Sequence, residues 1–192
     1  MKTVKNIKPE IRDLSQKQID EHFLLYEGYV KKQNELDERM KTIDLSDANA
    51  TFSLLREIKL EETFASNAIK LHEGYFQNIG GNGNPEGDVK RLIEQDFGSF
   101  ERWGQEFTSL GMCARGWIVL AFDWDEMKLR NVLCDVHNQG GLWNCTPILI
   151  LDVYEHAYFV DFATARKKYI ETFMKNINWK FINELVKKYK IA

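Results

Sequence analysis

The sequence has few cysteines, prolines and histidines, and it has no long hydrophobic run. Its three cysteines form no CxxC pair, so neither a disulfide framework nor a cysteine zinc site is expected, and the cytoplasm is the expected location. The longest clean apolar run, residues 117–122, is far shorter than the roughly 20 residues of a membrane helix. The N-terminal lysines are followed by no apolar core, so we expect no secretory signal and no membrane association.

An excess of positive charge is absent as well. The chain has 26 lysine and arginine residues against 29 aspartate and glutamate residues, which gives a net charge of −3. It therefore lacks the positive field that drives non-specific nucleic-acid binding, and we expect no nucleic-acid partner. What is present is an aromatic-rich chain of 192 residues that is 44% hydrophobic. This length is sufficient to bury a core in one domain or in two small ones.

The first half of the chain has the pattern of two helices. Ser15 is an N-cap candidate, and apolar residues then recur at spacings of three and four over residues 19–30. A second helical stretch runs from about residue 52 to residue 78 and ends at the glycine-rich segment 79–87, which is the strongest loop signal in the sequence. We therefore predict an N-terminal helical hairpin domain over residues 1–82.

The second half changes character. Two helical stretches precede three β-rich runs, and two more helical stretches close the chain. The β-rich runs are residues 117–122, 129–136 and 147–153. Short connections that contain turn residues separate these runs, which predicts an antiparallel sheet. The predicted fold class is α+β, in which the hairpin domain is followed by an α+β domain over residues 83–192 with a three-stranded antiparallel sheet.

The clearest chemical signal is the segment that joins Asp152 to His156. Asp152 follows an apolar strand pattern, and a carboxylate at such a place is costly unless it is paired, caps a helix or binds a metal. A carboxylate and an imidazole together favour iron, manganese or zinc over calcium or magnesium. The alternative is that Asp152 caps the next helix and that His156 is a structural histidine, and the segment alone does not separate the two interpretations.

Two further histidines lie within helical patterns. His22 and His72 are each followed by aromatic residues, and a histidine of this kind taken alone is more often a core or boundary residue than a metal ligand. Together with His156 they would join two helices and a strand end around one metal ion. The fourth histidine, His137, begins the polar, glycine-rich segment 137–141, for which we predict an exposed turn.

This constellation resembles the iron/manganese superoxide dismutase family. The family signature is an aspartate, any residue, an aromatic, glutamate, histidine, a small residue and two aromatics, and it occurs here as residues 152–159. The resemblance extends from about Leu14 to Tyr189 and includes the histidines of both predicted hairpin helices. The family fold, a helical hairpin followed by an α+β domain around a three-stranded sheet, agrees with the prediction from the sequence pattern.

The resemblance implies a redox-active metal centre. Its ligands would be His22, His72, Asp152 and His156, which would hold one manganese or iron ion per subunit with a solvent molecule in the fifth position. Such an ion cycles between the +3 and +2 states. It oxidises one superoxide to oxygen and reduces a second one to hydrogen peroxide, so the implied activity is that of a superoxide dismutase.

The resemblance also implies two catalytic residues beside this centre. Tyr29 matches the gateway tyrosine that relays protons, and Gln139 falls where manganese-type members carry the glutamine that bonds the metal-bound solvent. Iron-type members supply that glutamine from the second helix, where this chain has Ala68, so manganese is slightly favoured. The alternative for Gln139 is an ordinary turn residue. The candidates for a hydrophobic wall around the metal, or for plain core aromatics, are Trp117, Trp143 and Tyr154.

A homodimer is implied as well, because Glu155 matches the residue that bonds the ligand histidine of the other subunit, here His156.

The chain departs from the family in the first helix, where a second histidine normally comes four residues after the ligand and a tyrosine comes eight residues after it. Here that histidine is absent, Tyr29 comes seven residues after His22, and Phe159 replaces the tyrosine that the missing histidine normally bonds. Shortening a helix by one residue rotates its later residues by about 100°. We therefore expect either a local irregularity in the helix or a Tyr29 that points away from the site.

Two other functions stay open. The altered proton relay is consistent with a family member that binds metal in a structural or storage role with weak or no dismutation. Zinc-dependent hydrolysis is disfavoured, because four protein ligands leave little room for an activated water and a substrate.

Overall fold

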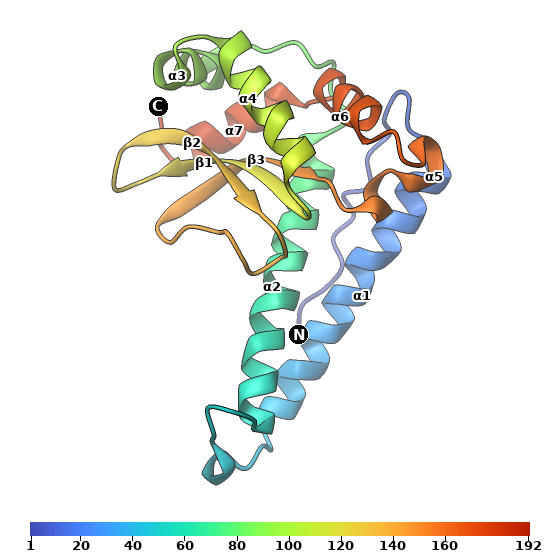
Figure 1. Cartoon of the computed structure of the whole chain (residues 1–192), viewed down its shortest axis with the longest axis vertical. Helices are drawn as coiled ribbons and strands as arrows, with labels where there is room; N and C mark the ends of the chain where they lie inside the picture. The colour runs from blue at the N-terminus through green and yellow to red at the C-terminus, as the bar shows by residue number, and fades with distance from the viewer.

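The N-terminal half forms a long helical hairpin in the computed structural model, which describes residues 1–192. The hairpin consists of α1 (Gln16–Met40), the short 3-10 helix η1 (Leu45–Asp47) and α2 (Leu54–Asn78) (Figure 1). Ser15 and Ser53 start the two long helices, because the side-chain oxygen of each accepts a backbone N–H from the first turn. The predicted hairpin is therefore confirmed.

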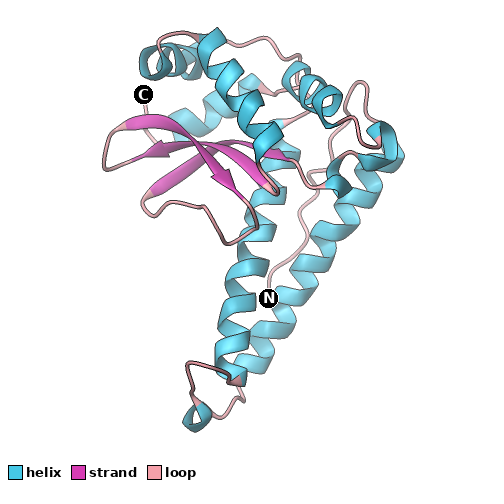
Figure 2. Ribbon diagram, viewed as in Figure 1, coloured by secondary structure: helices cyan, strands magenta, loops and turns pink.

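The second half combines helices with a small sheet (Figure 2). Its elements are α3 (Gly87–Phe97), α4 (Phe100–Cys113), β1 (Trp117–Asp123), β2 (Lys128–Cys134), β3 (Cys145–Asp152), η2 (Glu155–Ala157), α5 (Phe159–Phe162), α6 (Arg166–Lys175) and α7 (Trp179–Lys188). The strand order is β2-β1-β3, and β1 pairs antiparallel with both neighbours. The predicted α+β class with a three-stranded antiparallel sheet is confirmed.

The central strand β1 determines where β3 ends. Trp117, the first residue of β1, lies opposite Cys134 of β2 on one side and opposite Asp152 of β3 on the other. Every residue of β1 is buried, which agrees with its continuous apolar sequence. Helix α2 packs against β3, and the Asp152 carboxylate lies 3.0 Å from Nε2 of His22 in α1, so this end of β3 lies against the helical hairpin.

One main hydrophobic core extends through both halves of the chain. Phe23 and Tyr75 of the hairpin belong to the same buried cluster as Leu149 of the sheet. Only a small separate cluster lies away from this core, and it contains Leu36 of α1 and Ile58 and Ala65 of α2. The division into domains 1–82 and 83–192 stays a prediction, because a shared core does not test whether either part folds alone.

The glycine-rich loop after α2 is packed against the C-terminal part of the chain. The N–H of Gly81 donates to the carbonyl oxygen of Asn176 at 2.9 Å. A Cβ atom at Gly81 would lie 2.4 Å from the carbonyl oxygen of Ile177, so only glycine allows this close approach. The loop that marks the change of composition therefore also joins the two halves.

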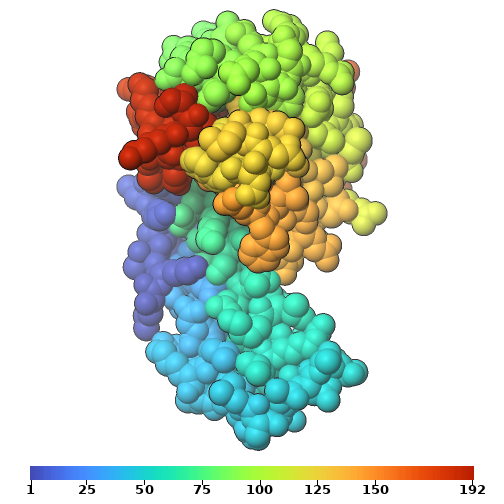
Figure 3. Space-filling model, turned by 90° about the vertical axis from the view of Figure 1, so that its left-hand side faces the viewer, coloured from blue at the N-terminus to red at the C-terminus, as the bar shows by residue number.

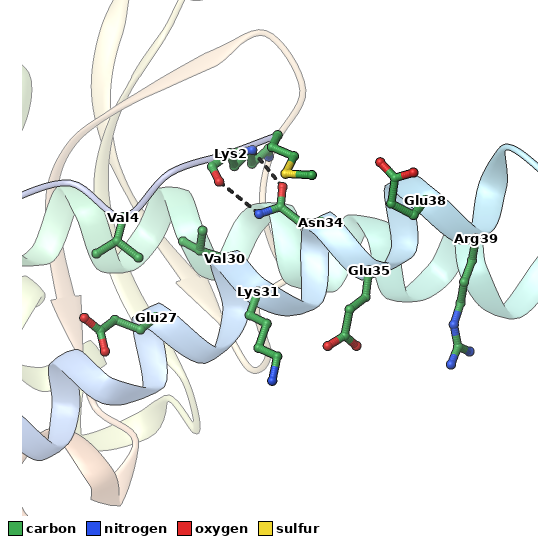
Figure 4. A pocket seen from close by; sticks show the side chains of 10 residues that line it. Lys2, Val4, Glu27, Val30, Lys31, Asn34, Glu35, Glu38 and Arg39 are labelled. Carbon is green, nitrogen blue, oxygen red and sulfur yellow. Dashed lines mark hydrogen bonds between the residues drawn. The ribbon is translucent and has the colours of Figure 1, made fainter.

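The N-terminal segment runs along the outside of the hairpin (Figure 3). The backbone of Lys2 exchanges two hydrogen bonds with the side-chain amide of Asn34, and the N–H of Lys5 donates to the hydroxyl of Tyr26. Beside it lies a surface groove of about 660 Å³, whose charged lining residues are of both signs (Figure 4). None of the four histidines lines this groove. No helix of the chain is both long enough and apolar enough to cross a membrane.

Candidate metal centre

Four side chains from four elements converge where the hairpin meets the sheet. They are His22 of α1, His72 of α2, Asp152 at the end of β3 and His156 of η2, and one potential ligand atom from each lies within 4.8 Å of the others. Bonds of about 2 Å from one transition-metal ion to nitrogen and oxygen ligands place those ligands about 3 to 4 Å apart. The four residues that the family resemblance names as ligands are thus brought close enough together to surround one ion.

The carboxylate of Asp152 lies at the middle of the cluster. Its Oδ2 atom is 3.0 Å from Nε2 of His22, 3.2 Å from Nε2 of His156 and 3.8 Å from Nε2 of His72. Its Oδ1 atom accepts the backbone N–H of Tyr154 at 2.9 Å. Asp152, His22 and His72 are buried, whereas the side chain of His156 is 27% exposed.

Two buried nitrogens in this cluster, Nδ1 of His22 and Nε2 of His72, have no hydrogen-bond partner, and the second of them faces a carboxylate. Nδ1 of His72 lies 2.7 Å from the carbonyl oxygen of Ala68, and a carbonyl oxygen only accepts, so Nδ1 carries the proton. Nε2 of neutral His72 is then an unprotonated lone pair, and it is a buried atom without a partner. It faces the Asp152 carboxylate, so two electron-rich atoms face each other in a dry site. A cation bound between them resolves this, and the residues therefore fit a metal ion.

The pKa shifts of His22, His72 and Asp152 also suit metal binding. Burial lowers the pKa of His22, and it lowers the pKa of His72 to about 3, so both imidazoles are neutral ligands near neutral pH. Burial alone would raise the pKa of Asp152, but the charge and hydrogen bond of His156 and the hydrogen bond of His22 outweigh it and lower that pKa. Burial likewise opposes a charge on His156, yet the Asp152 carboxylate raises the pKa of that imidazole.

A pair of buried tyrosines supports the backbone of Asp152 from behind. The hydroxyl of Tyr169 donates to the carbonyl oxygen of Asp152 at 2.7 Å and lies 3.1 Å from the hydroxyl of Tyr75. A phenol has one proton, so the proton between the two hydroxyls comes from Tyr75. The ring of Tyr75 also lies 4.9 Å from that of His22, so this tyrosine contacts His22 directly and is connected to Asp152 through Tyr169.

Aromatic rings surround the cluster. Trp117 meets His72 edge to face at 5.0 Å, and Tyr154 stacks on His156 at 5.2 Å with an angle of 15° between the rings. Both residues therefore lie where a hydrophobic wall was expected. The expectation for Trp143 is wrong, because this side chain is 96% exposed in the loop between β2 and β3. A glycine-rich loop carries it along the surface, away from the core.

Tyr29 lies beside the cluster in spite of the shortened spacing. Helix α1 is continuous from Gln16 to Met40, and the ring of Tyr29 lies 5.5 Å from that of His72. Seven residues are close to two full helical turns, so a residue at this spacing returns to the face of His22. The expectation of a helix irregularity or of a Tyr29 that points away is therefore wrong.

His137 is the residue near the site that sequence reasoning missed. It is buried rather than in an exposed turn, and it joins Tyr29 to the wall. Nε2 of His137 lies 3.0 Å from the hydroxyl of Tyr29, and Nδ1 accepts the indole N–H of Trp117 at 3.0 Å. The sequence offers one indication of this contact, because the N–H of a buried indole needs a hydrogen-bond acceptor. That requirement does not identify which residue supplies the acceptor.

Gln139 does not reach the cluster. Its side chain is exposed, and its backbone forms a tight bridge with Val136. This turn directs His137 inwards and Gln139 outwards, so the expectation that Gln139 faces the metal site is not supported by its position. The alternative interpretation of Gln139 as a turn residue agrees with the structure.

Comparisons with known proteins identify the family of the chain. The family model "Iron/manganese superoxide dismutases, C-terminal domain" matches residues 85–185. The chain is 39% identical over 190 residues to "Superoxide dismutase [Fe]" of Aquifex pyrophilus, covering 95% of this chain and 89% of that protein. It is 37% identical to "Superoxide dismutase [Fe]" of Cupriavidus metallidurans over 88% of this chain and 87% of that one. It is 43% identical to "Superoxide dismutase [Mn]" of Haloarcula marismortui over 57% of this chain and 55% of that one. The chain belongs to the iron/manganese superoxide dismutase family.

Proposed function

We propose that this protein is a superoxide dismutase that converts superoxide to oxygen and hydrogen peroxide at a mononuclear iron or manganese centre. The proposed ligands are His22, His72, Asp152 and His156. The observation that carries the proposal is the bare, buried Nε2 of His72, 3.8 Å from the Asp152 carboxylate. Three imidazoles and one carboxylate form a donor set suited to these ions.

The proposed stoichiometry is one ion per subunit, and the ion supplies the one-electron couple between the +3 and +2 states that dismutation requires. The slight preference for manganese depended on Gln139 at the metal-bound solvent. Since the side chain of Gln139 is exposed, that argument no longer favours either metal. Relatives of both kinds, named [Fe] and [Mn], resemble the chain.

Tyr29 is the proposed proton donor, with His137 determining the direction of its hydroxyl. The indole N–H of Trp117 can only donate, so Nδ1 of His137 is unprotonated and Nε2 of the neutral ring carries the proton. That Nε2–H donates to the oxygen of Tyr29. The hydroxyl proton of Tyr29 is then not used in this bond and is free to move towards the reduced substrate.

The aromatic wall keeps the site apolar. Trp117 meets His72 edge to face, and Tyr154 stacks on His156. Superoxide is small enough to enter a site from which these rings exclude larger ligands. Burial and the Asp152 charge raise the pKa of Tyr29, so its hydroxyl keeps its proton until it is needed. In this arrangement the chain binds the ion, excludes bulk water and supplies a proton.

A homodimer is the proposed functional unit, with Glu155 bonded to His156 of the partner subunit. Glu155 is exposed and forms no ion pair within the chain, although it is adjacent to His156. The usual histidine–tyrosine bond between subunits has no counterpart here. Leu25 and Phe159, which occupy the region, are 40% and 48% exposed, and we propose that they add apolar contacts to this interface.

The proposed location is the cytoplasm. The three cysteines are unpaired, with Cys113 exposed, Cys145 partly buried and Cys134 buried, which is compatible with a reducing compartment.

The decisive test is metal analysis of the purified protein together with a superoxide assay of iron- and manganese-reconstituted forms. We expect one ion per subunit and dismutation far above that of the free metal. Stoichiometric iron or manganese without dismutation above the free-metal control would support the structural or storage role instead. Stoichiometric zinc with esterase activity would revive the hydrolytic alternative.

A further inference from the structure

Gln18 of α1 connects this helix to the main chain that carries His156. Its side chain is fully buried. The Nε2 atom donates to the carbonyl oxygen of His156 at 2.6 Å, and the Oε1 atom accepts the N–H of Val160 at 3.0 Å. One amide group therefore uses both its donor and its acceptor on the segment after β3.

The two backbone groups that Gln18 bonds are four residues apart. In a continuous α-helix, the N–H of Val160 would donate to the carbonyl of His156. The chain instead changes here from the 3-10 helix η2 to the short helix α5. The amide of Gln18 lies between the two groups and satisfies both. A polar side chain inserted into a helical ladder in this way bends the chain at that point.

A second contact holds the same segment to the start of α1. The N–H of Ser15, the N-cap residue, donates to Oδ2 of Asp161 at 2.6 Å. Gln18 is four residues before His22, so the two side chains lie on the same face of α1, one turn apart. The first two turns of α1 thus hold His22 directly and hold the backbone of His156 through Gln18.

His156 is the member of the cluster whose place depends most on such support. It lies in a 3-10 helix of three residues, and its side chain is 27% exposed while those of His22, His72 and Asp152 are not exposed at all. The long helices α1 and α2 fix His22 and His72, and the sheet fixes Asp152. For His156 the carbonyl bond from Gln18 performs this task.

We propose that Gln18 is a positioning residue, which sets the backbone of His156 so that its imidazole meets the ion held by the other three ligands. The inference rests on the proposed metal centre. Groups that orient a metal ligand without touching the metal change metal affinity by about 10- to 100-fold when they are removed.

The chain offers a matched control in Gln33. It lies on the same helix, is buried, and joins two groups through its amide: Nε2 donates to Asp37 at 2.8 Å, and Oε1 accepts the hydroxyl of Ser66 at 2.7 Å. It is 15 residues after Gln18 in the sequence, or about 22 Å along the helix axis. Gln33→Met therefore removes a similar buried amide far from the cluster.

The experiment compares Gln18→Met with Gln33→Met in the iron-loaded protein. For Gln18→Met we expect release of iron to a chelator about 10- to 100-fold faster than in the unchanged protein, with an altered rhombicity of the ferric EPR signal. For Gln33→Met we expect both to stay as in the unchanged protein, even if its melting temperature falls. In metal-free protein, the amide of Val160 should exchange its proton faster in Gln18→Met only.

Unchanged iron release and an unchanged EPR signal in Gln18→Met would overturn the proposal and leave Gln18 a purely structural residue. If this variant does not fold, Gln18→Glu is measured in the same way, because it keeps the acceptor for Val160 and loses the donor to His156. Failure of the metal centre itself is recognised separately, because His156→Ala would then hold as much iron as the unchanged protein.

Discussion

The hydroxyl of Tyr29 lies 3.0 Å from Nε2 of His137, so a helix of the hairpin is hydrogen-bonded to the loop after β2. The opposite nitrogen of the same ring accepts the indole N–H of Trp117, the first residue of β1. A donor-only group at one end of this chain of bonds determines the direction of every proton in it. The hydroxyl proton of Tyr29 is consequently the one that is free to leave.

Removing that proton should slow turnover without emptying the site. For Tyr29→Phe we expect an unchanged metal content and a turnover lower by about 100-fold, at the lower end of what a positioned proton donor contributes. Pulse radiolysis and metal analysis of the same sample measure the two quantities. Tyr26→Phe is the control, because its hydroxyl bonds Glu73 and Lys5 instead of the cluster. Equal rates for Tyr29→Phe and the unchanged protein would remove Tyr29 from the mechanism.

The burial of His137 makes its own contribution to the pH dependence of stability. Burial lowers the pKa of His137 to about 4, whereas an unfolded chain has a histidine pKa of about 6.5. Between these values the unfolded state binds a proton that the folded state does not, so stability rises with pH. The contribution of His137 is complete above about pH 6.5 and is lost as the pH falls through about 4.

Replacing His137 should therefore flatten the acid side of the stability profile. For His137→Gln we expect the free energy of unfolding to fall less steeply between about pH 6.5 and 4, by nearly one proton per molecule. Urea denaturation at several pH values measures the slope, and His72, whose pKa is lowered in the same direction, is present in both proteins. A slope that is unchanged in His137→Gln would mean that His137 is protonated in the folded state.

The elements of the fold could be predicted from the sequence because each has a local cause. Ser15 and Ser53 cap the hairpin helices, and the continuous apolar sequence of β1 predicts a buried strand. The directions in which the side chains of the loop after β2 point have no such local cause. Whether His137 or Gln139 points inwards depends on one tight turn at Val136, and the surrounding residues are compatible with either outcome.

The residues of the site also divide into those that the sequence predicts and those that it does not. Asp152 and His156 were predictable because four residues separate them within one specific motif. The position of Tyr29 follows from the period of the helix and not from the usual family spacing of eight residues. A spacing of seven residues is closer to two full helical turns than a spacing of eight, so Tyr29 lies on the same face as His22. The exposure of Trp143 could not be predicted from its type, since a tryptophan in a glycine-rich loop has no local partner that determines where it lies.

The metal should depend on His156 and not on His137, although both are histidines close to the cluster. For His156→Ala we expect loss of most of the bound metal, because removal of one of four ligands opens the site and leaves Asp152 buried with fewer partners. His137→Gln should keep its metal. Elemental analysis after dialysis against a chelator measures both, and equal metal retention by the two variants would contradict the proposed ligand set.

Burial should protect one cysteine from alkylation. Burial and the neighbouring Asp135 raise the pKa of Cys134 to about 11, so at pH 8 only about one thiol in a thousand is the reactive thiolate. Cys113 is exposed. We expect iodoacetamide to modify Cys113 in the folded protein and Cys134 only after denaturation, as measured by peptide mass spectrometry. Rapid labelling of native Cys134 would show that β2 opens readily.

The interface proposal is tested most directly at Glu155, which is exposed and forms no ion pair within the chain. If Glu155 bonds His156 of the partner subunit, Glu155→Ala should weaken the dimer and also change how tightly and how selectively the metal is held. Analytical ultracentrifugation and metal analysis give the two readouts, with Glu184→Ala on the exposed face of α7 as the control. Because Leu25 and Phe159 offer apolar surface instead of the usual polar pair, we expect the dimer to be weakened rather than abolished. An unchanged dimer dissociation constant together with full metal content in Glu155→Ala would contradict the assignment.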